Sequence, residues 1–170
     1  MQEKEEKSTD EAMWKISSDF AGYMPQAFDD EIRKISAGKY DAKIKDAELK
    51  IFREAGKKGK KYATYLNLPL DNALEVAEAF RMINSAITGP ETESETMKGK
   101  GDTAKITIKK CPICSKSLET GTDRRIVYEM CMNFAGSAVE NLNPAYKLVF
   151  QKSICNCDSL CEMIVVRRYA

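Results

Sequence analysis

The chain of 170 residues contains no histidine. Without an imidazole, serine–histidine and cysteine–histidine nucleophile pairs, HExxH zinc proteases and histidine-ligated haem or metal are all excluded. A general base would have to be a carboxylate, a lysine, a tyrosine or a thiolate. The chain also lacks an excess of charge of either sign, because 27 Lys and Arg stand against 26 Asp and Glu. No strong field attracts nucleic acid or an anionic membrane, so we expect no direct nucleic-acid partner.

Long apolar runs are lacking as well. No window approaches the roughly 18 apolar residues of a membrane span, and the polar, charged residues 1–10 do not resemble a secretory signal. We therefore expect a cytoplasmic protein with no membrane partner. With 43% hydrophobic and 31% charged residues, the composition is that of a globular protein large enough to bury a core.

Apolar spacing divides the chain near Pro90 into two parts. In the helical part, 11–90, apolar residues recur at helical spacing. This pattern predicts helices over 10–23, 28–36, 43–66 and 71–87, the last one capped by Asp71 or Asn72. Residues 1–10 are expected to be a disordered N-terminus.

The second part, 91–170, is predicted to form a hairpin, a helix and another hairpin. Strands are predicted at 92–98 and 104–108, and again at 146–153 and 162–168. The helix between the hairpins is predicted to begin at Thr122 or Asp123 and to end before Asn143. The two parts together predict one α+β domain over 11–170.

Small residues line one face of the predicted 43–66 helix. Ala55, Gly59 and Ala63 follow one another at i+4 spacing. A glycine within a helix is costly and usually has a packing reason, so we favour close packing against another helix. The alternative is that this face leaves room for a ligand.

All six cysteines lie in the second part of the chain: Cys111, Cys114, Cys131, Cys155, Cys157 and Cys161. In a reducing cytosol, clustered thiols are more often metal ligands, redox groups or buried thiols than disulfides. The CxxC of Cys111 and Cys114 follows a strand, where both sulfurs can reach one tetrahedral metal. The remaining ligands are then predicted to come from Cys155, Cys157 and Cys161. The alternative is a redox dithiol, but that chemistry is typical of a CxxC that begins a helix in a βαβ unit.

Thiolate ligands suit zinc or an iron–sulfur cluster, and the sequence does not choose between these two cofactors. Cys131 lies on an apolar helical stripe and is interpreted as a buried thiol, with metal ligation as the alternative. Glu162 is a candidate mixed ligand or base because it follows Cys161, although an exposed strand charge is the simpler interpretation.

The order of features in the second part resembles the C-terminal signature of the 4-vinyl reductase and hydrocarbon-binding superfamily. A cysteine-bearing helix ends at Asn143-Pro144, a strand follows, and Cys157-Asp158-Ser159-Leu160-Cys161-Glu162-Met163 precedes the last strand. In the related L-2-amino-thiazoline-4-carboxylic acid hydrolase-like proteins, the closing motif is Gly-Asp-x-x-Cys-x-Phe. Asp158 and Cys161 match it, while Cys157 replaces the glycine and Met163 the phenylalanine. The stretch from Glu54 to Gly59 resembles the glycine-containing helix of these families.

This resemblance covers roughly Ile44 to Arg168 and implies an α+β fold in which helices pack on an antiparallel sheet and enclose an apolar pocket. In some members a zinc ion held by cysteines and a carboxylate lies beside the pocket, and dimers are common, so a homodimer is expected. The extra cysteines depart from the family's simplest pattern and keep an iron–sulfur cluster open as the alternative. The expected pocket lining is Ala55, Gly59, Ala63, Phe80 and Phe134.

Three functions follow from these observations. The first is a small-molecule binding or sensing domain for an apolar or aromatic ligand, with a cysteine-ligated metal, zinc in the first instance, beside its pocket. The second is a hydrolase-like enzyme in which Cys161, Asp158 and Glu162 take part; it ranks lower because the chain has no histidine. The third is an iron–sulfur or metal carrier acting on a partner protein, which would have labile, partly exposed coordination.

Overall fold

The computed structural model describes residues 28, 31–32, 34–36, 42–89, 91–119 and 121–168. The expected disorder of 1–10 and the predicted helix at 10–23 lie outside these residues. The described helices are α2 (Ala42–Gly56), α3 (Gly59–Tyr65), α4 (Ala73–Thr88), α5 (Pro112–Glu119), α6 (Arg124–Leu142) and the short 3-10 turn η1 (Ile154–Asn156). The strands are β1 (Glu93–Lys98), β2 (Thr103–Lys110), β3 (Tyr146–Lys152) and β4 (Cys161–Arg167).

The four strands form one antiparallel sheet in the order β1-β2-β4-β3. Along β4, Cys161, Met163 and Val165 are buried while the residues between them are only partly so. This alternation places one face of the sheet against the helices. The strand order makes β1 and β3 the two edges of the sheet.

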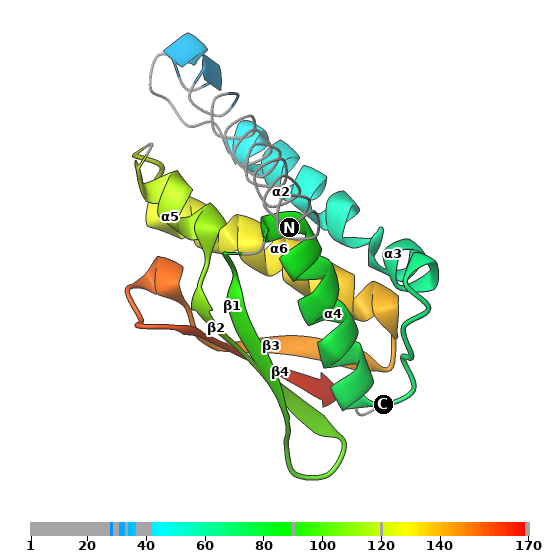
Figure 1. Ribbon diagram of the computed structural model, residues 1–170. Helices are drawn as coiled ribbons and strands as arrows, with labels where there is room; N and C mark the ends of the chain where they lie inside the picture. Colours follow the sequence, from blue (N-terminus) through cyan, green and yellow to red (C-terminus); the bar gives the residue numbers. More distant parts are fainter. Residues whose placement is uncertain are drawn as a thin grey trace, which may run out of the picture.

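The helices lie in two layers over that buried face (Figure 1). Helix α4 contacts β1, β2 and β4, whereas α6 contacts β3 and α4. Helices α2 and α3 pack on α6 on the side away from the sheet. The α+β class with a helical first part and an antiparallel sheet is therefore confirmed, as one domain.

Two of the predicted helix caps can now be assigned. Asn72 accepts a hydrogen bond from the backbone N–H of Glu75 (3.1 Å) and caps α4. Asp123 accepts one from the backbone N–H of Arg125 (2.8 Å) and caps α6. Both helices thus begin where a side chain satisfies a free N–H of the first turn.

The predicted 43–66 helix is interrupted. Helix α2 ends at Gly56 and α3 begins at Gly59, so a turn separates them. Both glycines are buried against α6, and a Cβ at Gly56 would lie 2.3 Å from the carbonyl oxygen of Phe134. The small face therefore serves close helix packing, and the glycines that permit it also weaken the helix.

Helix α5 is missing from the sequence-based prediction. It begins at Pro112, within the CxxC motif, directly after β2. Proline is well suited to the first helical position because its fixed φ is helical and its missing N–H has no partner there. The segment is only eight residues long, too short for its apolar spacing to be distinctive.

Asp102 joins three parts of the fold. Its carboxylate accepts hydrogen bonds from the backbone N–H of Ala73 (3.0 Å) and from the hydroxyl of buried Tyr146 (2.6 Å). Arg167 lies 3.8 Å away, on β4. The β1–β2 turn is thereby tied to the start of α4 and to the end of the sheet.

We predict that Asp102 makes stability depend on acidity. The Tyr146 hydroxyl holds the pKa of this carboxyl below its ordinary value. Its stabilising contribution is therefore present above the unfolded-state pKa of about 4 and is lost as the pH falls through the folded-state pKa. Asp102→Asn is expected to cost at most about 1 kcal/mol at neutral pH, because water screens a carboxylate that is 37% exposed, and to reduce the loss of stability in acid.

Urea unfolding at pH 6 and pH 3 measures this effect. The control is Asp71→Asn, which changes an exposed carboxylate near the same joint. If the free energy of unfolding of Asp102→Asn differed between pH 6 and pH 3 as much as that of wild type, the acid sensitivity would lie in other groups.

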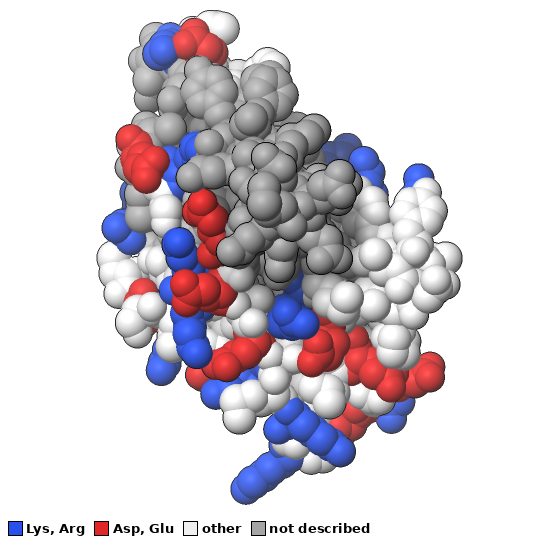
Figure 2. Space-filling model, in the orientation of Figure 1, with Lys and Arg blue, Asp and Glu red and all other residues white. Residues whose placement is uncertain are grey.

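Charges of both signs are interspersed over the face shown in Figure 2. Many form surface ion pairs, such as Lys109–Glu95 (3.2 Å) and Lys105–Glu162 (3.4 Å). None of the described helices is both long enough and apolar enough to span a bilayer.

Candidate metal centre

Four cysteines meet at the end of the sheet where β4 begins. Ile108 near the end of β2 is paired with Cys161, the first residue of β4. The chain leaves β2 directly into Cys111 and α5, and η1 carries Cys155 on the connection from β3 to β4. The pairing of β2 with β4 therefore brings the CxxC next to the cysteine-rich loop, as the sequence predicted.

The four thiols form one group, which we call the thiol cluster: Cys111, Cys114, Cys155 and Cys161. The Cys155 thiol donates to the Cys114 sulfur at 3.2 Å, and each of the four lies within electrostatic range of the other three. Cys114, Cys155 and Cys161 are 2%, 5% and 7% exposed, and all six cysteines are free thiols. The cluster is thus part of the interior.

Hydrogen-bond donors surround these sulfurs. The backbone N–H groups of Ile113 and Cys114, in the first turn of α5, point to the sulfur of Cys111. The backbone N–H of Ile154 donates to the sulfur of Cys161 (3.4 Å), and the Ser153 hydroxyl also bonds to that sulfur. Such bonds stabilise a thiolate more than a thiol and so offset part of the burial that raises the pKa of Cys111 and of Cys161.

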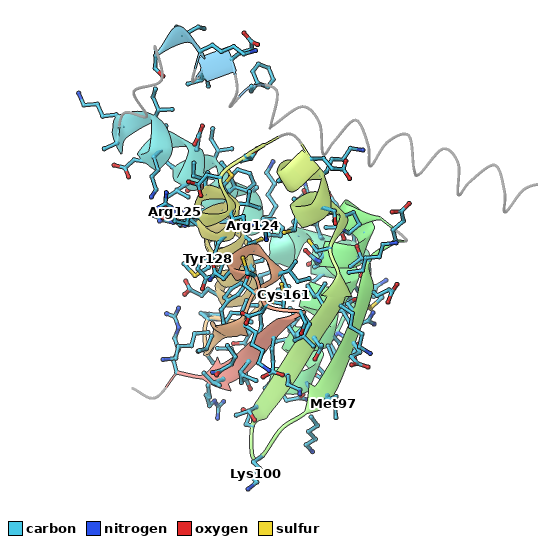
Figure 3. The ribbon with its side chains drawn as sticks, turned by 90° about the vertical axis from the view of Figure 1, so that its left-hand side faces the viewer. Met97, Lys100, Arg124, Arg125, Tyr128 and Cys161 are labelled. Carbon is cyan, nitrogen blue, oxygen red and sulfur yellow. The ribbon has the colours of Figure 1, made fainter. Side chains whose placement is uncertain are left out.

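A cation also faces the cluster. Arg124, in the first turn of α6, donates to the carbonyl oxygen of Ile154 (3.4 Å), and its charge has a minor influence that favours the thiolate forms of Cys114 and Cys155. Figure 3 shows Arg124, Tyr128 and Cys161 in the same region of the molecule. An arginine in this position offsets part of the net charge of a metal bound by four thiolates.

Without a metal, most of the cluster remains protonated at neutral pH. Burial raises the pKa of Cys111 to about 11 and is also the main cause of the raised pKa of Cys161. The Cys155 thiol donates to Cys114, which raises the pKa of Cys155 and lowers that of Cys114. Cys111 is therefore no activated nucleophile, although it stands at a helix start as in redox dithiols, whose attacking thiol has a lowered pKa.

The donor set suits a thiophilic metal, but the side chains are not yet placed around one. Among the described residues, no group of three or more His, Cys, Asp or Glu side chains is arranged to hold a metal ion. Sulfurs around a tetrahedral zinc with bonds of about 2.3 Å lie about 3.8 Å apart, farther than the 3.2 Å between Cys114 and Cys155. Metal binding would require this hydrogen-bonded pair to open and the other two side chains to turn toward it.

Of the remaining candidate ligands, Cys131 lies beside the thiol cluster, whereas Cys157 and Glu162 lie away from it. Cys157 is exposed in a left-handed conformation (φ 68°) at the end of η1. Glu162 follows Cys161 on β4, so its side chain is on the opposite face, where it pairs with Lys105. Cys131 is half-buried on α6 near the cluster, and burial raises its pKa well above the ordinary value.

The residues of the hydrolase-like hypothesis converge only in part: the charge of Asp158 acts on Cys161, whereas Glu162 faces away. Asp158 accepts the backbone N–H of Ser153 (2.8 Å) and so closes the loop around η1. Glu162 faces the other side of the sheet from Cys161. Asp158, which matches the closing motif of the hydrolase-like proteins, therefore has a structural role in this chain.

The residues expected to line an apolar pocket occupy packing positions. Gly59 and Ala63 are buried, Gly59 lies against Ala138 of α6, and Phe80 is in the core at 2% exposure. Ala55 is half-buried on α2, and Phe134 packs against the core from α6. None of the five lines the open groove described next, and their role in ligand binding stays a prediction.

An open groove of about 450 Å³ lies between α6 and the edge strand β3. Its lining is Tyr128, Met132, Asn133, Gly136, Leu148, Val149 and Phe150. Tyr128 links the groove to the thiol cluster, because it packs against the buried group of Cys114, Val127 and Cys155 and meets the ring of Phe150 edge-on at 5.9 Å.

Sequence reasoning did not identify Arg124, Ser153 or the groove. Arg124 follows the Asp123 cap, so its place beside the cysteines depends on the contact between α6 and η1. Ser153 lies two residues before Cys155 and accepts the backbone N–H of that cysteine. A serine at this spacing is a local signal for such a bond, and it could have indicated Ser153. The groove depends on the strand order, which no local pattern specifies.

Comparison with known proteins gives the fold alone. No family model matches the chain, and no curated protein matches it. Among solved structures, it is similar to a trafficking protein particle complex subunit 3 from Naegleria fowleri covalently bound to palmitic acid. The TM-score is 0.55 at 14% identity, covering 91% of this chain and 97% of the other.

Proposed function

We propose that this chain is a binding domain built around a structural zinc ion held by the thiol cluster. The observation that carries the proposal is the approach of four mostly buried thiols from three separate segments. Free thiols gain little from such a gathering, whereas four thiolates around zinc are a common structural site. The surrounding N–H groups and Arg124 suit the negative charge that results.

Burial favours a structural site over a carrier. A metal carrier needs ligands that a partner can reach, and the one cysteine classed as exposed, Cys157, lies outside the cluster. A catalytic site needs an open coordination position beside an acid or base. Asp158 lies near Cys161, but its carboxylate accepts the backbone N–H of Ser153, and Glu162 pairs with Lys105 on the other face, so the hydrolase-like hypothesis gains little support from these two residues.

Zinc would cross-link three segments of the chain. It would tie the start of α5 to the loop between β3 and β4 and to the first residue of β4. The chemistry supplied by the ion is a cross-link that holds this end of the domain in one arrangement.

Elemental analysis of protein purified without oxygen tests the proposal. We expect about one zinc per chain and no visible colour. Cys114→Ser and Cys161→Ser are expected to lose the metal, while Cys157→Ser, the matched exposed control, keeps it. Iron with acid-labile sulfide would show that the thiol cluster holds an iron–sulfur cluster and not zinc. Wild-type protein free of any metal would overturn the proposal.

A second proposal concerns an apolar small-molecule ligand. Its support is the fold shared with a protein that carries palmitic acid. We expect an organic extract of the purified protein to contain a fatty acid or another apolar molecule in near-stoichiometric amount by mass spectrometry. An empty extract, together with no binding of added palmitate, would contradict it.

A further inference from the structure

The outer edge of β3 is open along the groove. Leu148, Val149 and Phe150 are consecutive residues of an edge strand, and all three line the groove. Successive side chains of a strand point to opposite faces, so three in a row can line one hollow only if it runs along the strand's edge. On that edge every second residue leaves its backbone N–H and C=O unpaired.

The α6 wall opposite this edge is mostly apolar, with Asn133 as its amide side chain, and it leaves space. Tyr128 and Met132 of α6 face the groove together with Leu148 and Phe150 of β3. A Cβ at Gly136 would meet nothing within 4 Å, so the absence of a side chain there keeps the groove open. An added strand could pair with β3 and place every second side chain against α6.

The charges beside the groove indicate the charge of the segment that it would bind. Lys147 and Lys152 are exposed at the two ends of β3, and neither has an ion-pair partner among the described residues. Glu129, on the groove-bearing helix, is already paired with Lys45 at 2.5 Å. The charge left unbalanced on this strand is therefore positive.

We propose that the groove between α6 and β3 binds an extended segment of a partner protein in which apolar residues alternate and acidic residues flank them. The segment adds a fifth strand to the sheet beside β3. A second copy of this chain fits less well, because β3 has two lysines and no acidic residue, and pairing two copies would gather four lysines. This inference does not depend on zinc or on a small-molecule ligand.

Selection from a displayed library of random peptides tests the proposal on the full chain. We expect the enriched peptides to alternate apolar residues with acidic flanks. Gly136→Trp should weaken their binding at least about tenfold by filling the groove, whereas Gly136→Ala should change it by less than about threefold. Lys147→Glu with Lys152→Glu should weaken binding and reduce its dependence on salt.

Hydrogen exchange with a selected peptide identifies strand addition. We expect new protection at the backbone amides of β3, which a helix lying in the groove would not give. Thermal unfolding checks that Gly136→Trp is folded, as the open space at Gly136 leads us to expect.

Three outcomes would overturn the proposal. One is a library without enrichment, or peptides that bind Gly136→Trp as well as wild type. The second is palmitate that binds wild type, fails to bind Gly136→Trp and displaces the peptides, which would make the groove a small-molecule site. The third is a dimer, by light scattering, that Gly136→Trp converts to monomer, which would make the groove an interface between copies.

Discussion

Replacing Gly56 by alanine is expected to lower the free energy of unfolding by roughly 1 to 3 kcal/mol, the usual cost of an overpacked contact. The new Cβ would lie 2.3 Å from the carbonyl oxygen of Phe134 and 3.0 Å from the backbone nitrogen of Ala138. Both atoms belong to the backbone of α6, so no side chain can turn away and the helices must separate.

Separation of α2 from α6 would also strain the polar contacts between them. The Ser137 hydroxyl donates to the carbonyl oxygen of Arg53 (2.8 Å), and the Arg53 guanidinium donates to the side-chain oxygen of Asn133 (2.8 Å). Lys45 pairs with Glu129 further along the same interface. These contacts depend on the close approach that Gly56 permits.

Gly136→Ala is the matched control, because it makes the same change on the facing helix. A Cβ there meets nothing within 4 Å. Alanine is favoured over glycine within a helix by roughly 0.5 to 1 kcal/mol, so this variant should be slightly more stable than wild type. Urea unfolding of the two variants measures both effects. Equal stability of Gly56→Ala and wild type would mean that α2 and α6 are not held at this distance.

The sequence predicted elements wherever local signals are strong. The capped helices α4 and α6 have regular apolar spacing, and all four strands lie within one or two residues of their predicted positions. The small face of α2 and α3 indicated helix packing, because a buried glycine usually has a packing reason. It could not indicate that Gly56 rather than Gly59 makes the closest contact, since this depends on how α6 crosses.

The candidate site could be predicted only in part. The spacing of the cysteines indicated that a CxxC and a cysteine-rich loop would meet, and strand pairing brings them together. The sequence could not indicate which cysteine of the loop faces outward. Cys157 does so because its own backbone is left-handed, and no local pattern predicts this conformation. The simpler interpretation of Glu162, a charge on the strand, agrees with its place on the face opposite Cys161, because adjacent residues of a strand point to opposite faces.

Removal of the zinc that we propose for the thiol cluster is expected to have the largest effect on stability. Structural zinc in small modules binds with apparent free energies of roughly 10 to 16 kcal/mol, and much of this becomes folding free energy. A chelator should therefore lower the unfolding midpoint of wild-type protein strongly under reducing conditions. Cys161→Ala should match chelated wild type and show no further response to chelator, because its site can no longer close.

Cys131→Ala is the control that separates ligation from packing. Cys131 lies near the cluster on α6, and its loss should cost only about 1 to 2 kcal/mol, the usual range for a point mutation, while the response to chelator remains. If Cys131→Ala abolished that response, Cys131 would replace one of the four proposed ligands. A response that persisted in Cys161→Ala would remove Cys161 from the set instead. The two variants change thiols near the same cluster, so the difference between their chelator responses identifies the ligand rather than the packed side chain.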